Sequence, residues 1–186
     1  YYVIDEWHTL IPYSRFKKIG KWIESKIIKK SDRVYVINEK LGEYVIHMGS
    51  REYKLIRAGV NVSMFSPNSN RHSVRSKYEL SEDDFVLLFM GTLFPFSGIV
   101  ELISSMDRGQ LEQYNIKLLL VGSFRNAEFK KEIQSIIDSN RLAPYVIITG
   151  KLPYEEMPSI LSSANICLLT AQKNETMRNI VPIKMY

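Results

Sequence analysis

The feature that most constrains the fold is an unbroken apolar run from Phe85 to Met90, which stops at Gly91. A continuous apolar run that ends at a turn residue is typical of a strand buried on both faces, as in a parallel sheet. A new apolar period begins near Gly98 and has the spacing of a helix that packs back on this strand. Strand, glycine turn and helix form half of a βαβ unit, in which the helix N-terminus faces ligand phosphates.

Similar units are predicted on both sides of this run. The chain alternates between short β-rich apolar runs, at 1–5, 34–37, 54–59, 116–121, 145–150 and 165–170, and helical patterns, at 14–30, 39–47, near 73–78, 98–106, 126–139 and 155–163. Asn38 is expected to cap the helix at 39–47, and Pro158 is early enough in the helix at 155–163 to be tolerated. This alternation predicts an α/β fold of two doubly wound, Rossmann-like pieces with parallel sheets. Residues 61–75 are rich in Asn, Ser and Pro and are predicted to link domains at 1–60 and 76–186.

The composition fits a packed protein without a membrane span. Apolar residues make up 45% of the chain, and no apolar run approaches the roughly twenty residues that a span needs. The one cysteine, Cys167, excludes a disulfide scaffold and is expected in the core of a protein from a reducing compartment. The chain starts within a strand and without an initiator methionine. We therefore expect a piece of a longer protein, cut at both ends.

Basic residues are concentrated in the helix predicted for Ser14 to Lys30, although the net charge of the chain is only +5. An apolar stripe at helical spacing, with Trp22 and Ile28 at its flanks, consists of Phe16, Ile19, Ile23 and Ile27. The opposite face carries Lys17, Lys18, Lys21 and Lys29. One interpretation is an ordinary surface helix with a solvated lysine face. The other is a helix on an anionic membrane surface, where each lysine adds about 1 kcal/mol. Without a recognised motif or aromatic–basic interleaving, no nucleic-acid partner is predicted.

Three of the four strands predicted for the second domain end at a glycine, namely Gly91, Gly122 and Gly150. Glycine lets a backbone approach a ligand closely, and ligands of open α/β sheets lie at the carboxyl ends of the strands. Together these ends predict a nucleotide-sized cleft. A plain dinucleotide-binding or sensory domain is another candidate, but the chain lacks the G-x-G-x-x-G fingerprint with its acidic ribose ligand.

Six blocks of the chain, in order and spacing, resemble glycosyltransferase family four. They are SDRVYVINEKLGEYVIHMG, KLIRAGVNVSMFSP, FVLLFMGTLFPFSGIVELI, IKLLLVGS, VIITGKLPYEEMPSILSSANICLLTA and PIKMY, within about residues 30–186. The resemblance implies two Rossmann-like domains that face each other, the GT-B fold, incomplete here at both ends. Residues 1–60 would end the acceptor-side domain, and residues 76–186 would form most of the domain that binds the donor.

The resemblance also implies an activity. Members of the family transfer a sugar from a nucleotide diphosphate sugar and retain its anomeric configuration. The acceptor expected here is a cell-envelope, lipid-linked or polysaccharide glycan, and the transferred group is a hexose. No tightly bound metal or cofactor is expected, because basic side chains and helix N-termini neutralise the leaving diphosphate. The implied location is the cytoplasm, at the inner membrane face, and this piece alone is expected to be inactive.

Several donor-binding residues follow from the resemblance. The family commonly has Gly-Arg after the first strand of this domain and Lys-Gly at the next helix start, whereas this chain has Gly91-Thr92 and Ser97-Gly98. Both cations are therefore replaced by hydroxyl residues. The remaining donor-binding positions that the resemblance implies are Lys151, Leu152, Ile183 and Lys184. The cations that are candidates to compensate for the two losses are Arg125, Lys173, Arg178 and Lys184.

The catalytic residues implied by the resemblance are His8 and Asn179. His8 follows the first strand, where many members place a histidine near the transferred sugar. The family carries two acids separated by seven residues, and PIKMY resembles the segment just before the second, so the first falls on Asn179. An amide can hydrogen-bond a sugar hydroxyl but gives no negative charge to an oxocarbenium-like transition state. The alternative function is therefore a degenerate nucleotide-sugar-binding relative that acts as a partner subunit.

Overall fold

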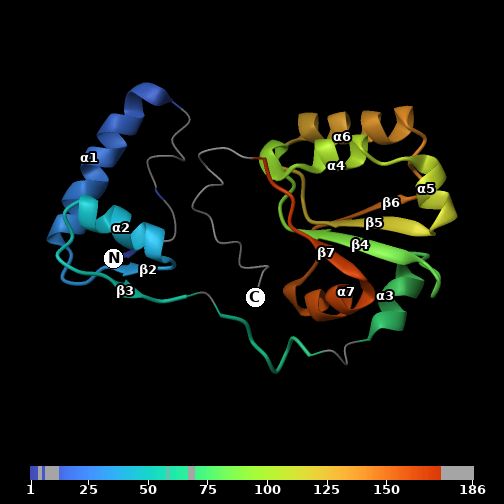
Figure 1. The fold of residues 1–186 in the computed structure, drawn as a ribbon, viewed down its shortest axis with the longest axis horizontal. Coiled ribbons are helices and arrows are strands. Elements are labelled where there is room, and N and C mark those ends of the chain that lie inside the picture. Colours follow the sequence, from blue (N-terminus) through green and yellow to red (C-terminus); the bar gives the residue numbers. More distant parts are fainter. Residues whose placement is uncertain (4–5, 7–12, 58, 67–69, 173–186) are drawn as a thin grey trace. The chain divides into compact units, whose positions relative to one another are not determined.

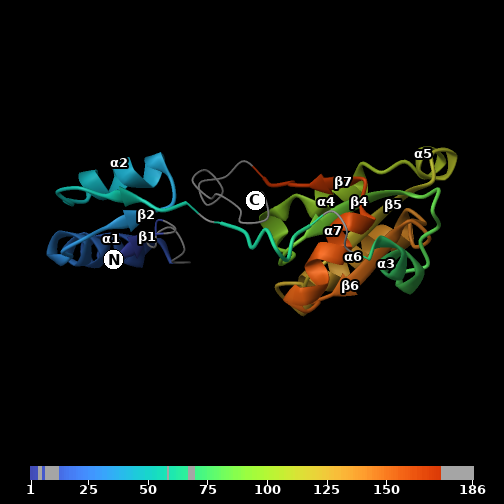
Figure 2. The same cartoon turned by 90° about the horizontal axis from the view of Figure 1, so that it is seen from below.

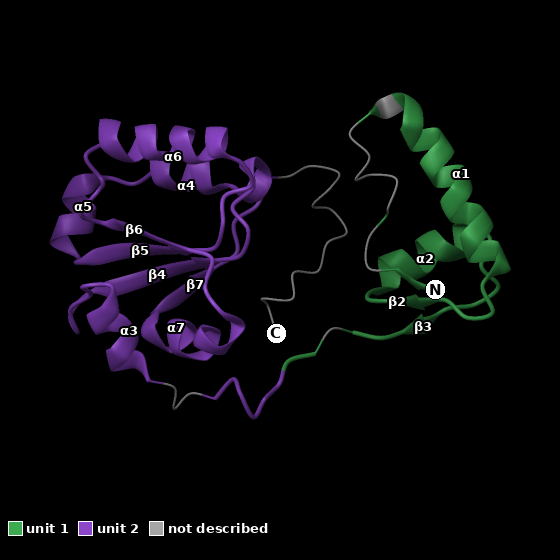
Figure 3. Cartoon of the chain, turned by 180° about the vertical axis from the view of Figure 1, so that it is seen from behind, with its two compact units in different colours: residues 1–60, 173–186 green, residues 61–172 purple. Residues whose placement is uncertain are grey.

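The computed structural model describes residues 1–3, 6, 13–57, 59–66 and 70–172. Its described residues divide into two compact units, unit 1 within residues 1–60 and unit 2 within residues 61–172 (Figure 3). Each unit is built on its own parallel sheet. The predicted α/β class with two Rossmann-like pieces is thereby confirmed. Among the described residues, no helix combines the length and the apolar content needed to cross a bilayer.

Unit 1 is a three-stranded sheet in the order β1-β2-β3. Its elements along the chain are β1 (Tyr2–Val3), α1 (Ser14–Lys30), β2 (Tyr35–Val36), α2 (Glu39–His47) and β3 (Lys54–Leu55). Figure 1 shows α1 and α2 on one side of these strands. Asn38 caps α2 as its sequence position predicts, because its side-chain oxygen accepts a hydrogen bond of 2.8 Å from the backbone N–H of Leu41. The core between helices and sheet contains Val3, Ile28, Val36, Leu41 and Val45.

A buried carboxylate joins the two helices of unit 1. Glu24 lies on α1 and is fully buried, and its Oε2 accepts a 2.7 Å hydrogen bond from the hydroxyl of Tyr44 on α2. The next residue of α1, Ser25, donates through its hydroxyl to the carbonyl oxygen of Met48, one turn after Tyr44, at 2.9 Å. A carboxylate is tolerated in a core when hydrogen bonds replace its water, so this pair fixes how α1 packs on α2.

Unit 2 has a four-stranded sheet in the order β6-β5-β4-β7, with every pair parallel. Its strands are β4 (Phe85–Met90), β5 (Ile116–Val121), β6 (Val146–Gly150) and β7 (Ile166–Leu168). Its helices are α3 (Arg71–Lys77), α4 (Ile99–Ser104), α5 (Arg108–Gln113), α6 (Ala127–Ser139) and α7 (Met157–Ser163), with 3₁₀ turns η2 (Pro95–Ser97) and η3 (Tyr154–Glu156). Helices α4 and α6 cover one face of the sheet, and α3 and α7 cover the other (Figures 1 and 2).

The central strands of unit 2 are buried on both faces, as their continuous apolar runs predict. Leu118 and Leu120 of β5 belong to the core beneath α4 and α6, whereas Leu119 and Val121 belong to the core beneath α3 and α7. Strand β4 divides its side chains in the same way, with Phe89 in the first core. Successive strand residues point to opposite faces, so a two-sided sheet needs an apolar residue at every position.

The prediction that Cys167 is a core residue was wrong. The cysteine is exposed, and Ile166 beside it is 47% exposed. Both lie on β7, which in the described part of the chain pairs only with β4 and therefore forms an edge of the sheet. An apolar run identifies a strand, but it does not state whether that strand has neighbours on both sides.

Two helices of unit 2 carry little apolar signal. Helix α5 was not predicted and is started by Asp107, whose Oδ1 accepts a 2.9 Å hydrogen bond from the N–H of Gln110. Helix α3 was predicted near 73–78 and starts at Arg71, within the segment predicted as a linker; its buried residues are Val74 and Arg75. Its start was misplaced because a helix that buries an arginine has little apolar periodicity to mark its bounds.

Arg75 holds together distant segments of unit 2. Its side chain is only 1% exposed and is surrounded by oxygen atoms. The guanidinium donates to the carbonyl oxygens of Ser81 at 2.6 Å, Asp84 at 2.9 Å and Ser163 at 3.3 Å. It also reaches Oδ1 of Asn165 at 3.3 Å, and that same oxygen accepts a 2.8 Å hydrogen bond from the N–H of Val86. Arg75 therefore connects α3 to the end of α7 and to the starts of β4 and β7.

Candidate functional site

The carboxyl ends of the unit 2 strands lie along one edge of the sheet, where the glycines have unusual backbone conformations. Their φ angles are +135° at Gly91, +143° at Gly122 and +74° at Gly150, which L side chains rarely adopt. A Cβ on Gly122 would lie 1.9 Å from the carbonyl oxygen of Gly91. The close approach that Gly122 permits is thus between two loops of the protein, so this glycine is required by the fold itself.

These loops continue the pairing of β4 and β5 beyond the strands. The N–H of Leu93 donates to the carbonyl oxygen of Ser123 at 2.9 Å, and the N–H of Arg125 donates to that of Leu93 at 3.0 Å. Leu93 is fully buried, whereas the side chain of Arg125 is exposed. The loop after β4, which carries predicted donor-binding residues, is therefore held in place by the buried side chain of Leu93.

The loop after β4 is also tied to the loop after β7. Ser97 is buried, its hydroxyl donates to the carbonyl oxygen of Phe94 at 2.6 Å, and its own carbonyl accepts a 2.7 Å hydrogen bond from the hydroxyl of Thr170. Gly98 has φ of +72°, and a Cβ there would lie 3.2 Å from the backbone nitrogen of Ala171. The Ser97 hydroxyl is engaged within the loop, whereas the side chain of Thr92 is exposed.

A further connection at this edge was missed by sequence reasoning. Gln172 donates through Nε2 to Oε1 of Glu101 at 2.6 Å, and its backbone N–H donates to the carbonyl oxygen of Phe96 at 3.0 Å. The hydrogen bond from Gln172, followed by one from the backbone, lowers the pKa of the Glu101 carboxyl. The side chain of Glu101 on α4 is thereby connected to the segment after β7, beside the predicted donor site. Residues 71 positions apart in sequence give no local signal of such a pair.

Two exposed cations follow neighbouring strands at the same edge, Arg125 after β5 and Lys151 after β6. Leu152 beside Lys151 is half-buried and packs against the core beneath α3 and α7. The edge therefore offers an exposed hydroxyl at Thr92, backbone N–H groups and two cations. Such groups are suited to an anionic phosphate ligand.

The remaining predicted site residues, His8, Asn179, Ile183 and Lys184, lie outside the described residues, as do Lys173 and Arg178. Their roles stay predictions. The same holds for Gly91, Thr92, Ser97, Gly98, Lys151 and Leu152 as donor contacts, although the structure places all six after β4 or β6 at the carboxyl edge of the sheet.

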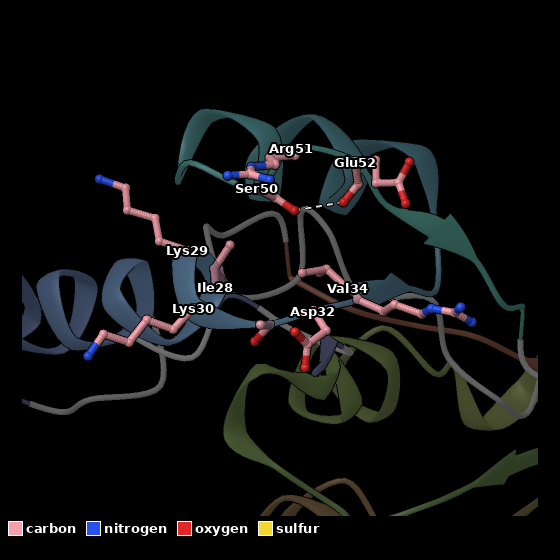
Figure 4. A pocket seen from close by; sticks show the side chains of 10 residues that line it. Ile28, Lys29, Lys30, Asp32, Val34, Ser50, Arg51 and Glu52 are labelled. Carbon is pink, nitrogen blue, oxygen red and sulfur yellow. Dashed lines mark hydrogen bonds between the residues drawn. The ribbon is translucent and has the colours of Figure 1, made fainter.

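Unit 1 contains a hollow of about 480 Å³, lined by residues 28–34 and 50–52 (Figure 4). Its lining includes the cations Lys29, Lys30, Arg33 and Arg51 and the acids Asp32 and Glu52. The hollow lies at the end of α1 and just before β2, which is the amino end of the parallel strands. Because open parallel sheets bind their ligands at the carboxyl ends, we assign no donor-binding role to it.

The family that the six sequence blocks resemble is also found by comparison with known proteins. Residues 70–177, more than half of the chain, match the model of the family Glycosyl transferases group 1. The chain therefore belongs to that family of glycosyltransferases. Among curated proteins, YtcC of Bacillus subtilis (strain 168), named as a glycosyltransferase, is 28% identical over 137 residues. The match covers 68% of this chain and 33% of YtcC.

Solved structures share the fold at lower identity. Sucrose-phosphate synthase from Thermosynechococcus elongatus is 21% identical with a TM-score of 0.67, over 91% of this chain and 43% of that protein. Anabaena Alr3699/HepE, solved in complex with UDP and glucose, is 17% identical with a TM-score of 0.71, over 92% and 45%. These matches confirm the GT-B fold. The chain spans a third of YtcC and less than half of each solved protein.

Proposed function

We propose that the full-length protein is a retaining glycosyltransferase, which moves a hexose from a nucleotide diphosphate sugar to a cell-envelope, lipid-linked or polysaccharide acceptor. The observation that carries this proposal is the carboxyl edge of the unit 2 sheet, where the side chains of Thr92, Arg125 and Lys151 are exposed. The chain that carries this edge belongs to a glycosyltransferase family. We place the protein in the cytoplasm, peripheral to the inner membrane face. Its acceptor domain would include unit 1.

The donor's diphosphate is the group that this edge has to recognise. Its negative charge increases as the sugar leaves, so groups that bind the departing phosphates stabilise the transition state. Thr92 replaces an arginine common in the family, and it can offer the diphosphate a hydrogen bond but no positive charge. We therefore propose that Arg125 and Lys151 supply positive charge from the neighbouring loops, together with Lys184 and the backbone around Ile183. In this proposal no tightly bound metal or cofactor is needed.

For the sugar itself, we propose that His8 contacts the transferred group from the acceptor side and that Asn179 hydrogen-bonds a sugar hydroxyl. A carboxylate at position 179 would stabilise positive charge on the anomeric carbon, which an amide cannot do. The missing charge must be compensated by other groups of the full-length protein. This requirement defines the second candidate function.

The second candidate is a catalytically degenerate relative that binds a nucleotide sugar as a partner subunit. The buried Ser97 favours it, because this position is a lysine in many family members and its hydroxyl here is engaged by Phe94. Without that cation the site has lost one means of holding the leaving group. The two candidates differ in turnover, whereas both predict binding of a nucleoside diphosphate.

The first experiment is calorimetric titration of the full-length protein with UDP, GDP and ADP and with their hexose conjugates. One diphosphate is expected to bind in preference to the others. Arg125→Gln and Lys151→Gln are each expected to weaken that binding about tenfold, as loss of a charge-assisted hydrogen bond does. The matched control is Arg108→Gln on α5, an exposed cation on the helix that leads into the amino end of β5, which should leave the affinity unchanged.

A folded full-length protein that binds none of these ligands would refute the donor site. Binding without turnover, in the presence of lipid-linked acceptors, would instead select the partner-subunit function.

A further inference from the structure

Helix α1 buries a face that is not its apolar stripe. The buried positions are Gly20, Glu24 and Ile28, which recur every four residues; Ile28 belongs to the core of unit 1, and Glu24 accepts a hydrogen bond from Tyr44 of α2. The apolar stripe remains exposed, with fractions of 44% at Phe16, 53% at Ile19, 38% at Ile23 and 42% at Ile27. The expected division into a packed apolar face and a solvated lysine face therefore does not describe this helix.

The outermost line of α1 combines cations with apolar side chains. With 100° per residue, Trp22 lies opposite Glu24, and Trp22 is 62% exposed. The residues that share this line are Arg15, Lys18, Ile19, Trp22, Lys26 and Lys29, and we call them the outer strip. Lys26 lies over the Trp22 ring with its Nζ 5.7 Å from the ring centroid. The ammonium groups and the indole thus share one surface.

The outer strip has no acidic residue to balance its charge. The single acid of α1 is Glu24, and it is fully buried against Tyr44. Lys21 and Lys30 on the same helix are also exposed, which extends the positive surface to both sides of the strip. In an isolated helix, Glu24 would place one negative charge among these lysines, but in the folded unit its carboxylate is buried.

The position of the strip restricts what can cover it. Another helix packed beside α1 on the same sheet would contact the side of α1, where Phe16, Ile23 and Ile27 lie. It would not contact Trp22, because side chains opposite the buried face point directly away from the sheet. A surface that meets α1 from outside is needed to contact the outer strip.

We propose that the outer strip docks on an anionic lipid bilayer. Trp22 and Ile19 would enter the boundary between headgroups and acyl chains, and the basic side chains would extend to lipid phosphates. Interfacial helices of this kind carry lysines beside a large aromatic residue, and tryptophan is enriched at this depth of the bilayer. A nucleic-acid surface fits the charge but offers no apolar layer for Ile19. This inference does not depend on the proposed transfer reaction.

The test is sedimentation of the full-length protein with vesicles of phosphatidylcholine alone or with about 30% phosphatidylglycerol. Binding is expected only to the anionic vesicles and should weaken as salt is added. The triple variant Lys18→Gln/Lys26→Gln/Lys29→Gln should lose affinity by about 100-fold, since each lysine near the surface contributes about 1 kcal/mol. Trp22→Ser is expected to lose roughly tenfold. The matched control is Lys40→Gln/Lys130→Gln/Lys131→Gln, which removes three exposed lysines elsewhere and should bind as the wild type does.

Four results would overturn the proposal. The first is equal binding to both kinds of vesicle or to neither, and the second is unchanged affinity of the triple variant. The third is a preference of the strip for DNA over anionic vesicles. The fourth is a fall of several degrees in the melting temperature of Trp22→Ser, which would mean that the strip packs against protein.

Discussion

Helices α1 and α6 cover the sheets of their respective units, but they use their apolar residues in opposite ways. In α6 the residues Phe129, Ile133 and Ile137 recur at helical spacing and are at most 3% exposed. In α1 the stripe that includes Ile23 stays exposed while Glu24 next to it is buried. Helix α6 also balances its two lysines with acids, whereas α1 has basic residues along almost its whole length.

The difference shows what apolar periodicity measures. Periodicity identifies a face that avoids water, but it does not identify the surface that covers that face. For α6 this surface is the sheet of its own unit. For α1 the buried positions are a glycine, a carboxylate bonded to α2 and one isoleucine, so the apolar stripe is available for another surface.

The largest predicted effect is a difference in stability between two isoleucine truncations, one on the buried face of α6 and one on the exposed stripe of α1. Ile133→Ala removes a fully buried side chain of α6 and should lower the unfolding free energy of unit 2 by about 2–5 kcal/mol. Ile23→Ala, its counterpart on α1, should change the stability of unit 1 by less than about 0.5 kcal/mol. Hydrogen exchange of peptides from β5 and from α2 measures the two units separately. A large loss from Ile23→Ala would show that the α1 stripe is packed.

The second prediction concerns the buried acid of α1. Glu24→Ala leaves the Tyr44 hydroxyl without the carboxylate oxygen that accepts its hydrogen bond and should destabilise unit 1 by about 1–3 kcal/mol. Glu43→Ala on the exposed face of α2 is the control and should have almost no effect. Chemical denaturation followed by circular dichroism gives both values. Equal losses in the two variants would contradict the buried role of Glu24.

The third prediction compares helix starts. Asn126 accepts a 2.8 Å hydrogen bond from the N–H of Phe129 at the start of α6, whereas Tyr13 at the start of α1 makes no capping hydrogen bond with its side chain. Asn126→Ala should therefore cost about 1 kcal/mol, and Tyr13→Ala much less. Asn38→Ala at the start of α2 should match Asn126→Ala. Thermal unfolding measures all three, and a similar cost for Tyr13→Ala would contradict the comparison.

The smallest predicted effect is on the pH dependence of unit 1. Burial and, next, the hydrogen bond to Glu24 raise the pKa of the Tyr44 hydroxyl. An unfolded tyrosine ionises near pH 10, so at high pH the unfolded state releases its proton while the folded state keeps it. Stability should therefore fall by about 0.4 kcal/mol between pH 9 and 10. Tyr44→Phe should remove this component, and denaturation of both proteins at the two pH values shows whether it does.

Much of the fold follows from local sequence. The run Phe85–Met90 was predicted as a two-sided strand, Asn38 as a helix cap and Pro158 as an early helix residue, and each has that place in the structure. These features depend on nearby residues, so a single sequence contains their cause. The order of such elements predicted the doubly wound α/β architecture, and the resemblance of six sequence blocks indicated the glycosyltransferase family and the GT-B fold.

Other features depend on residues that are far apart in sequence. Neither the inward position of Glu24 nor the edge position of Cys167 is visible in its neighbours, because each depends on which surfaces surround it. In the candidate site, Ser97 could be named from family spacing. The engagement of its hydroxyl by Phe94 and the pair of Gln172 with Glu101 required the fold.

Arg75 also affects when unit 2 can complete its fold during synthesis of the chain. Two of its acceptors, the Ser163 carbonyl and the Asn165 side chain, lie 88 and 90 residues further along the chain. At the usual pace of translation, about 5–20 residues per second, a nascent chain carries Arg75 for roughly 5–18 s before those partners are synthesised. During this interval α3 cannot complete its buried contacts, whereas unit 1 already has its three strands. The arginine therefore delays closure of unit 2 until the segment around β7 has emerged from the ribosome.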